Sequence, residues 1–324
     1  MTAQEYIQST LEELAKPIEQ QDIGSKTLED AIYAKVMSKK FRKLKADDDA
    51  VNITKRAIKH AIDNNAPLAF NVVFGGNKLW TLDEAPEIDW AELFATTYFL
   101  KWLKTIASVY EYGAKLEFYS EDVVLEVMNN LPKSETDQYS EGFKNMLNWL
   151  EQYIPDGISV SYRRYGEDYE SYDHFLTELE EAKKKVSDEL KGMLPSLDDA
   201  QKYATELNVR PSPGQTDDPL WREKVELIHQ SIERTETIER YFDDPQYVPV
   251  CPIYFPGCIT TGSTKKSLAK FWVGIGALQK IKNTHEYREI ILTPKQLENS
   301  SFEWEDTAIK GLIGRNLSKI RVIQ

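Results

Sequence analysis

The alternation of short apolar segments with longer helical patterns between residues 68 and 162 constrains the fold more than any other feature. Leu68–Phe74 is almost continuously apolar, which is typical of a strand buried on both faces. Lys115–Tyr119 and Ile158–Tyr162 are predicted to be strands too, with helical periodicity between the three. Strands that alternate with helices build parallel sheets. We therefore predict an α/β fold with a Rossmann-like, mostly parallel sheet.

The pattern divides the chain into four regions. Residues 1–65 are predicted to form a helical N-terminal region, and residues 66–168 a Rossmann-like α/β core. Residues 169–245 carry long, charged helical patterns and are predicted to be a helical insertion or cap, because apolar strands resume after them. Residues 246–324 are expected to complete the sheet as a C-terminal α/β part. The strands predicted in this last part are Phe271–Leu278, Glu289–Leu292 and Lys319–Ile323.

Composition excludes several classes of protein. The 324 residues are 41% hydrophobic and 29% charged, as in an ordinary globular protein. A formal net charge of -13 argues against extended contact with a phosphate backbone, so we expect no nucleic-acid partner. No apolar run reaches the roughly 18 residues of a membrane span. Because the amino terminus is acidic and lacks the apolar core of a signal peptide, we expect a cytoplasmic protein without membrane contact.

The cysteines and histidines do not indicate a metal site. Cys251 and Cys258 lie seven residues apart without a companion cluster, whereas a structural zinc site needs about four ligands. The spacing permits a disulfide in an oxidising compartment, but two reduced, semi-buried thiols are the favoured interpretation. The four histidines are scattered and show no metal-ligand or nucleophile-base spacing. We therefore expect neither a metal nor a cofactor.

Polar residues follow the ends of the predicted strands, where open α/β sheets bind their ligands. Glycines after the first strand allow a ligand to approach the backbone, and the lysine that follows offers a charge, or a nucleophilic amine once its pKa is lowered. Two adjacent arginines after the third strand suit bidentate recognition of phosphate or carboxylate. The candidate residues at these strand ends are Gly75, Gly76, Lys78, Ser120, Arg163 and Arg164.

Each of these candidates also has a purely structural explanation. The glycines and Lys78 fit a tight turn with a surface lysine, and Ser120 fits an N-cap of the next helix, which is the favoured interpretation. The two arginines fit ion pairs with Glu167 and Asp168.

Two acidic residues after the first strand, Asp89 and Glu92, are further candidates. They open a predicted helix, where capping and the helix dipole favour carboxylates. Their place just beyond the strand also allows an acid-base role in the crevice that Lys78 faces.

Two further segments are rich in groups that bind anions. The loop Thr260–Ser267 combines hydroxyls, a glycine and two lysines, so that Thr264, Lys265 and Lys266 suit a phosphate as well as a solvated turn. It lacks the second glycine of a P-loop, and ATP hydrolysis is not indicated. The basic run Lys39–Lys45 fits a solvated helix face better than an anion site.

Three segments together resemble the isonitrile (isocyanide) synthase family of paerucumarin and dityrosine-type biosynthesis. They are Phe74–Lys78, Pro86–Glu92 and Tyr112–Asp122. The family pattern is a strand that ends in Phe-Pro-x-Lys, then Pro-Asp-x-x-Glu at a helix start, then Gly-Ala-x-x-x-x-Ser-Asp-Gly. The chain departs from it at Gly75, which replaces the proline, and at Glu121-Asp122, which replace Asp-Gly.

The resemblance implies a Rossmann-like fold and an enzyme that converts the amino group of an amino acid to an isonitrile, with ribulose 5-phosphate supplying the carbon. By this resemblance Lys78 is the reactive or substrate-binding lysine, Asp89 and Glu92 are acid-base groups, and Ser120 is a crevice residue. The sugar phosphate is assigned by charge alone to Arg163, Arg164, Lys265 and Lys266.

We therefore expect a small-molecule biosynthetic enzyme with a small anionic substrate, of the isonitrile-forming type. Another transferase, or a nucleotide- or sugar-phosphate-binding enzyme on a similar sheet, fits the same observations. A third alternative is a protein without enzymatic activity that binds a partner protein through the charged helices of residues 169–242.

Overall fold

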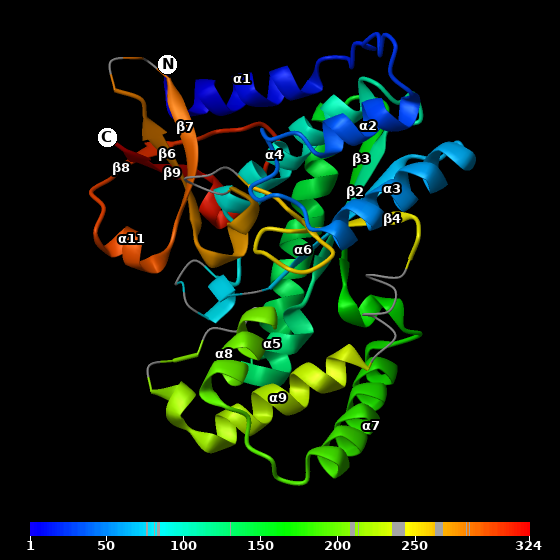
Figure 1. The fold of residues 1–324 in the computed structure, drawn as a ribbon. Helices are drawn as coiled ribbons and strands as arrows, with labels where there is room; N and C mark the ends of the chain where they lie inside the picture. The colour runs from blue at the N-terminus through cyan, green and yellow to red at the C-terminus, as the bar shows by residue number, and fades with distance from the viewer. Residues whose placement is uncertain are drawn as a thin grey trace.

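The fold is taken from a computed structural model that describes residues 1–75, 77–80, 82, 85–129, 131–207, 211–212, 214–234, 244–262, 268–282, 284 and 286–324. Within these residues the central sheet has five parallel strands in the order β3-β2-β1-β4-β5. This confirms the predicted α/β class and the parallel sheet (Figure 1). The strands are β1 (Leu68–Phe74), β2 (Ala114–Ser120), β3 (Ile158–Arg164), β4 (Tyr247–Cys251) and β5 (Ile259–Thr260).

The strand order reverses at β1, and this reversal positions the site. From β1 the chain passes outward to β2 and β3, and it later returns to the other side of β1 to form β4 and β5. Connections on either side of such a reversal leave in opposite directions, which opens a crevice at the carboxyl ends of the two neighbouring strands. By this rule we expect a ligand crevice in this protein where β1 and β4 end.

Helices pack on the sheet through aromatic side chains. Helix α4 (Trp90–Ala107) connects β1 to β2, and helices α5 (Asp122–Asn129) and α6 (Lys133–Leu150) connect β2 to β3. At the centre, Phe74 of β1 stacks on Phe143 of α6 with 5.8 Å between ring centroids. Phe74 also contacts Phe271 at 4.7 Å. Burial of these large rings fixes the position of the strand end that carries the candidate site.

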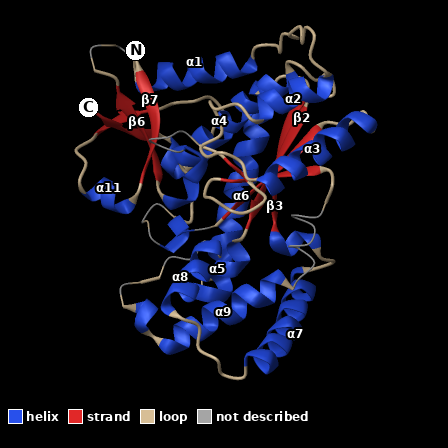
Figure 2. Ribbon diagram, in the orientation of Figure 1, coloured by secondary structure: helices blue, strands red, loops and turns tan. Residues whose placement is uncertain are grey.

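The N-terminal region is helical, as predicted, with α1 (Ala3–Ala15), α2 (Leu28–Val36) and α3 (Asp48–Asp63). Thr2, Thr27 and Asp47 cap the three helices by accepting backbone N–H groups, which explains where each helix begins. The predicted insertion is also helical, with α7 (Tyr172–Leu190), α8 (Leu197–Glu206) and α9 (Pro219–Glu233). These helices gather below the sheet, where α7 and α8 pack on α9 and α9 contacts α5 (Figures 1 and 2).

The C-terminal part differs from the expectation that it completes the sheet. Only β4 and β5 join the parallel sheet; a second, mixed sheet of four strands has the order β7-β6-β9-β8 among the described residues. Its elements are β6 (Ile275–Lys280), β7 (Tyr287–Leu292), α11 (Pro294–Glu298), β8 (Glu303–Asp306) and β9 (Lys319–Ile323). It lies beside α1 and α4, close to both chain ends (Figure 1).

Two local features explain this difference. Phe271–Val273, predicted as the start of a strand, belongs to the 3₁₀ turn η5 (Leu268–Val273), whose Phe271 packs on Phe74. In β9 the buried residues Ile320 and Val322 alternate with outward-facing ones, which is typical of a sheet with one solvated face. The division into four regions itself stays a prediction.

The sequence predicted a protein without membrane contact. None of the helices described here is long and apolar enough to cross a membrane. The cytoplasmic location stays a prediction.

Candidate functional site

A buried ionic network joins Lys78, Asp89 and Glu92. Lys78 lies in the 3₁₀ turn η1 (Asn77–Trp80) just past the end of β1. Its ammonium Nζ lies 2.8 Å from Asp89 Oδ2 and 2.5 Å from Glu92 Oε1. The three candidate residues that the sequence placed on two different segments are therefore in direct contact.

The same two carboxylates, Asp89 and Glu92, also cap the N-terminus of helix α4. Asp89 is its N-cap and accepts the N–H of Ala91 at 2.7 Å, while the N–H of Asp89 donates to Glu92 Oε2 at 2.9 Å. The capping interpretation of Asp89 and Glu92 is thus confirmed. Glu92 Oε1 additionally accepts a hydrogen bond of 2.9 Å from the hydroxyl of Tyr139 on α6. The second sheet contributes the N–H of Gly276, which donates to Asp89 Oδ1 at 2.8 Å.

Gly276 allows the second sheet to approach the network this closely. A Cβ atom at this position would lie 2.4 Å from the backbone nitrogen of Ala91 and 2.4 Å from the carbonyl carbon of Trp90. Only glycine therefore permits strand β6 to lie against the first turn of α4 and to donate its N–H to Asp89.

The network is closed to solvent. Lys78 is 1% exposed, Asp89 3% and Glu92 0%, so the alternative of a surface lysine at Lys78 is wrong. Buried charges of this kind persist only when they are paired and hydrogen-bonded, as they are here. Gly75 is also buried at the end of β1, whereas Gly76 lies outside the described residues.

Burial and the neighbouring charges set the protonation of the network. Burial alone lowers the pKa of Lys78, but Asp89 and Glu92 outweigh it and raise that pKa above its ordinary value. Lys78 is therefore held as an ammonium cation rather than as the free amine that attacks carbonyls. Burial raises the pKa of Glu92 to about 7, with Asp89 adding to the rise and Lys78 opposing it. A carboxyl group with this pKa can both release and accept a proton near neutral pH.

This pKa predicts a pH-dependent stability that is specific to Glu92. Its pKa is about 7 in the folded protein against an ordinary 4.5, so the folded state binds this proton more tightly than the unfolded chain. The associated stabilisation is complete below pH 4.5 and is lost as the pH rises through about 7. We expect the free energy of unfolding of the wild type to fall, relative to Glu92→Gln, between pH 5 and pH 8. Urea unfolding of both proteins at the two pH values measures this, and a constant difference would contradict it.

The carboxyl end of β2 lies beside this network. Ser120 is the register partner of Phe74, and the N–H of Glu121 donates to the carbonyl of Phe74 at 3.0 Å. The hydroxyl of Ser120 accepts the N–H of Asp122, the first residue of α5, at 3.3 Å. This contact supports the favoured capping role of Ser120.

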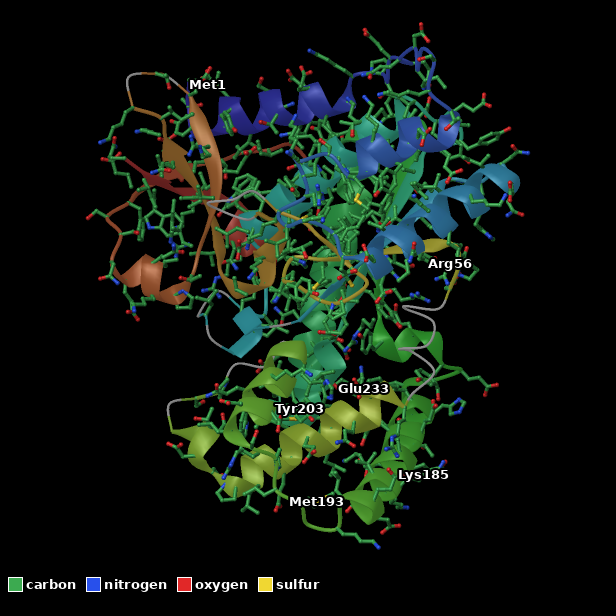
Figure 3. The ribbon with its side chains drawn as sticks, in the orientation of Figure 1. Met1, Arg56, Lys185, Met193, Tyr203 and Glu233 are labelled. Carbon is green, nitrogen blue, oxygen red and sulfur yellow. The ribbon has the colours of Figure 1, made fainter. Side chains whose placement is uncertain are left out.

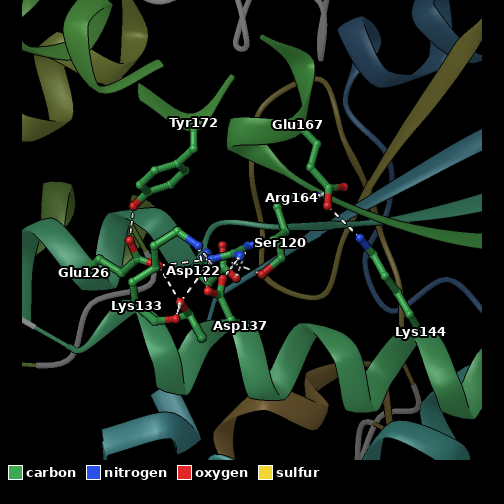
Figure 4. Close-up of polar contacts among 10 residues, drawn as sticks. Ser120, Asp122, Glu126, Lys133, Asp137, Lys144, Arg164, Glu167 and Tyr172 are labelled. Atoms are coloured by element: carbon green, nitrogen blue, oxygen red, sulfur yellow. Dashed lines mark hydrogen bonds and ion pairs between the residues drawn. The ribbon is translucent and has the colours of Figure 1, made fainter. Parts of the chain in front are cut away.

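Arg164 forms a second ionic network, which differs from both sequence interpretations (Figure 4). Its guanidinium Nε lies 2.8 Å from Asp122, Nη2 3.0 Å from Glu126 and Nη1 2.5 Å from Asp137. The hydroxyl of Tyr172 on α7 also donates to Glu126. Arg164 therefore connects the end of β3 to helices α5 and α6, and through Glu126 to α7, so its guanidinium is engaged by carboxylates of the protein itself.

The expected partners of the arginines need correction. Glu167 accepts only the backbone N–H of Arg164, at 3.2 Å, and pairs instead with Lys144 at 2.6 Å. The Arg163 Nη2 atom lies 2.8 Å from Glu117, and its guanidinium stacks on Tyr119 with 4.7 Å to the ring centroid. Sequence reasoning did not find these partners because they come from other strands and helices. The Asp168 side chain lies outside the described residues.

A different pair of cations, Lys43 and Lys270, lies near β5 and the end of β4. The backbone of Lys43 donates to the carbonyl of Thr260 at 2.7 Å, so the basic run is bound to β5 and does not form the helix face that we expected. Burial and the positive charge of Lys43 lower the pKa of Lys270 on η5. Burial and the charge of Glu121 raise the pKa of Cys251, at the end of β4, to about 12, which keeps it a thiol.

The sequence did not point to Lys43 and Lys270 as a pair of neighbouring cations. Lys270 adjoins a segment that we predicted to be a strand, and Lys43 belongs to a run assigned to a solvated helix. The only signal was the basic run itself. The loop residues Thr264, Lys265 and Lys266, which were proposed for phosphate, follow β5 directly but lie outside the described residues.

Cys251 and Cys258 are both free thiols, as expected.

Comparison with solved structures gives a likeness of fold. The crystal structure of PvcA from Pseudomonas aeruginosa matches with a TM-score of 0.59 over 92% of this chain and 100% of that chain, at 14% sequence identity. No family model and no curated protein matches the chain. At this identity the likeness shows a shared fold.

Proposed function

We propose that the protein is a biosynthetic enzyme of the isonitrile-forming type, which uses an amino acid and the sugar phosphate ribulose 5-phosphate. The observation that carries the proposal is the convergence of the three family-like segments at one place. Lys78 of the first segment contacts Asp89 and Glu92 of the second, and Ser120 of the third pairs in register with Phe74. Segments that resemble one family in sequence are thereby neighbours in space.

The fold likeness supports the same proposal. PvcA is an isonitrile synthase of paerucumarin biosynthesis, and its whole length aligns with this chain. The motif resemblance comes from residues 74–122, whereas the fold likeness extends over 92% of the chain.

The geometry suggests a role for each group. Glu92, with a pKa of about 7, is proposed to hold or release a proton during the reaction. Lys78 is proposed to supply fixed positive charge, and Asp89 to hold Lys78 and the first turn of α4 in place.

For the sugar phosphate we propose the crevice between β1 and β4. Lys43 and Lys270 provide positive charge there, and Lys270 has a lowered pKa because it is partly buried and lies near a second cation. Such a pair favours a dianion that restores the charge balance. Lys265 and Lys266 of the adjoining loop are proposed to assist. Arg163 and Arg164 are left out of this role, because carboxylates of the protein engage both.

The test is an assay with ribulose 5-phosphate and a panel of amino acids, with isonitrile products detected by mass spectrometry. We expect turnover by the wild type and a loss of about 100-fold or more in Glu92→Gln, because removal of a general acid-base group costs rates of this order. Glu141→Gln, at an exposed position on α6, is the matched control and should retain full activity. Consumption of neither substrate by the folded wild type would contradict the proposal.

One observation favours the alternative of a partner-binding protein. Large apolar side chains are exposed at the end of the helical region that is remote from the sheet, where Met193 lies (Figure 3). They are Met193, Leu194, Leu197 and Leu220. Arg222 joins the two segments that carry them by donating to the carbonyl of Pro195 at 3.2 Å. Association of the protein in sedimentation experiments that is lost in Met193→Ser/Leu220→Ser, together with an inactive isonitrile assay, would favour this alternative.

A further inference from the structure

A pocket lies between the second sheet and the first turn of α4. Its volume is about 270 Å³, and its wall includes Trp304 of β8, Arg315 of the 3₁₀ turn η6 (Arg315–Leu317), and Lys319 and Arg321 of β9. Asp89 and Trp90 lie on the side of α4. The volume is below the range of about 300–1,000 Å³ that is typical of drug-sized ligands, so the pocket suits a small molecule.

The pocket concentrates positive charge in an acidic protein. Lys319 and Arg321 project from the same face of β9, because the alternating residues Ile320 and Val322 are buried on the other face. Arg315 and Lys319 are exposed, and within the described part of the chain neither forms an ion pair with a carboxylate. Asp306 is the register partner of Lys319, yet the two are not paired within 4.0 Å. The formal net charge of the chain is -13, which makes such a cluster of cations unusual on its surface.

The indole ring of Trp304 lines the same wall of the pocket. The guanidinium of Arg321 lies 4.2 Å from the ring centroid of Trp304, and Lys319 Nζ lies 5.1 Å from it. Stacking on the ring restricts both cations to this side of the sheet, which lowers the entropy cost of binding an anion between them. Trp304 is nevertheless 47% exposed, so part of the ring remains available to a second flat group.

The one carboxylate at the back of the pocket is already neutralised. Asp89 is paired with Lys78 and accepts the N–H groups of Ala91 and Gly276. Its charge therefore opposes an anion in the pocket only weakly, and it is outweighed by Arg315 and Lys319, which pair with no carboxylate of the described residues.

We propose that this pocket binds a small aromatic phosphate monoester. The phosphate is held by Arg315 and Lys319, and the aromatic ring lies against Trp304. The guanidinium of Arg315 and the ammonium of Lys319 match the double negative charge and several oxygens of a phosphate, whereas a single carboxylate needs fewer donors. This site is distinct from the proposed sugar-phosphate crevice and does not depend on the isonitrile reaction.

Titration calorimetry with phenyl phosphate at low salt tests the proposal. We expect one binding site per chain, and inorganic phosphate should bind about tenfold or more weakly because it cannot stack on the indole. The variant Arg315→Met/Lys319→Met changes two exposed residues and is expected to fold normally. It should weaken binding of phenyl phosphate by about tenfold or more, because charged hydrogen bonds are lost.

A control of equal charge separates this site from general electrostatics. Lys184→Met/Lys185→Met removes two exposed lysines from α7 and should bind phenyl phosphate like the wild type. Absence of binding by the wild type, equal weakening by both double variants, or loss of binding only in Lys270→Met at the crevice would each overturn the proposal. Because the assay needs no turnover, an inactive enzyme in the isonitrile assay leaves this result unaffected.

Discussion

Replacement of Lys78 by methionine is expected to lower the free energy of unfolding by about 3–5 kcal/mol, because it leaves two carboxyl groups buried without their cation. Asp89 and Glu92 are 3% and 0% exposed, so water does not replace the lost ammonium. Glu92 can respond by binding a proton, since its pKa is already about 7. Urea unfolding at pH 8, where this response is weakest, measures the effect.

Two further variants test whether this loss of stability is specific to the buried network. Lys59→Met removes an exposed lysine that pairs with Asp63 four residues later in α3, and its effect on the free energy of unfolding should be much smaller than that of Lys78→Met. Lys78→Met/Glu92→Gln should be more stable than the sum of the two single changes implies, because the second substitution removes a charge that the first leaves unpaired. A cost for Lys78→Met as small as that of Lys59→Met would show that the buried network does not stabilise the fold.

Replacement of Arg164 by methionine is also expected to lower the free energy of unfolding strongly. Arg164 is the cation shared by Asp122, Glu126 and Asp137, so its loss leaves these carboxylates to repel one another. Asp122 and Glu126 are largely buried, and we expect a loss of about 3 kcal/mol in the free energy of unfolding. Hydrogen exchange should become faster in α7, since Tyr172 at its start donates to Glu126.

The neighbouring arginine is a matched control for this prediction. Arg163 has the same side chain one position earlier and pairs with Glu117, but it is 34% exposed. Arg163→Met should therefore cost less than about 1 kcal/mol and leave exchange in α7 unchanged. Equal costs for the two substitutions would contradict the role that we give to the Arg164 network.

Much of the fold was predictable because its signals are local. The apolar run Leu68–Phe74 indicated a strand buried on both faces, and the structure places it at the centre of the parallel sheet. The acidic pair Asp89 and Glu92 indicated a helix start, and the capping box at α4 confirms it. The assignment of the last strands was wrong in part, because the residues of a strand do not specify which sheet the strand will join.

The candidate site was predictable only as a set of residues. Lys78, Asp89 and Glu92 were chosen from their places after a strand and at a helix start, and the structure brings them into contact. Tyr139 and Gly276 complete the network from positions that carry no local signal. Lys43 and Lys270 come from distant segments, and only the folding of the chain brings their charges near each other.

By itself, the sequence determined which segments form strands and helices, because apolar periodicity and capping act between residues that are close along the chain. Only the tertiary structure decided which charges meet. Whether Lys78 is a surface amine or a buried ammonium, and whether Arg164 faces a ligand or three carboxylates, depends on neighbours from distant segments. Burial and those neighbours set the pKa values and the access of each group, and both follow from packing rather than from the local order of residues.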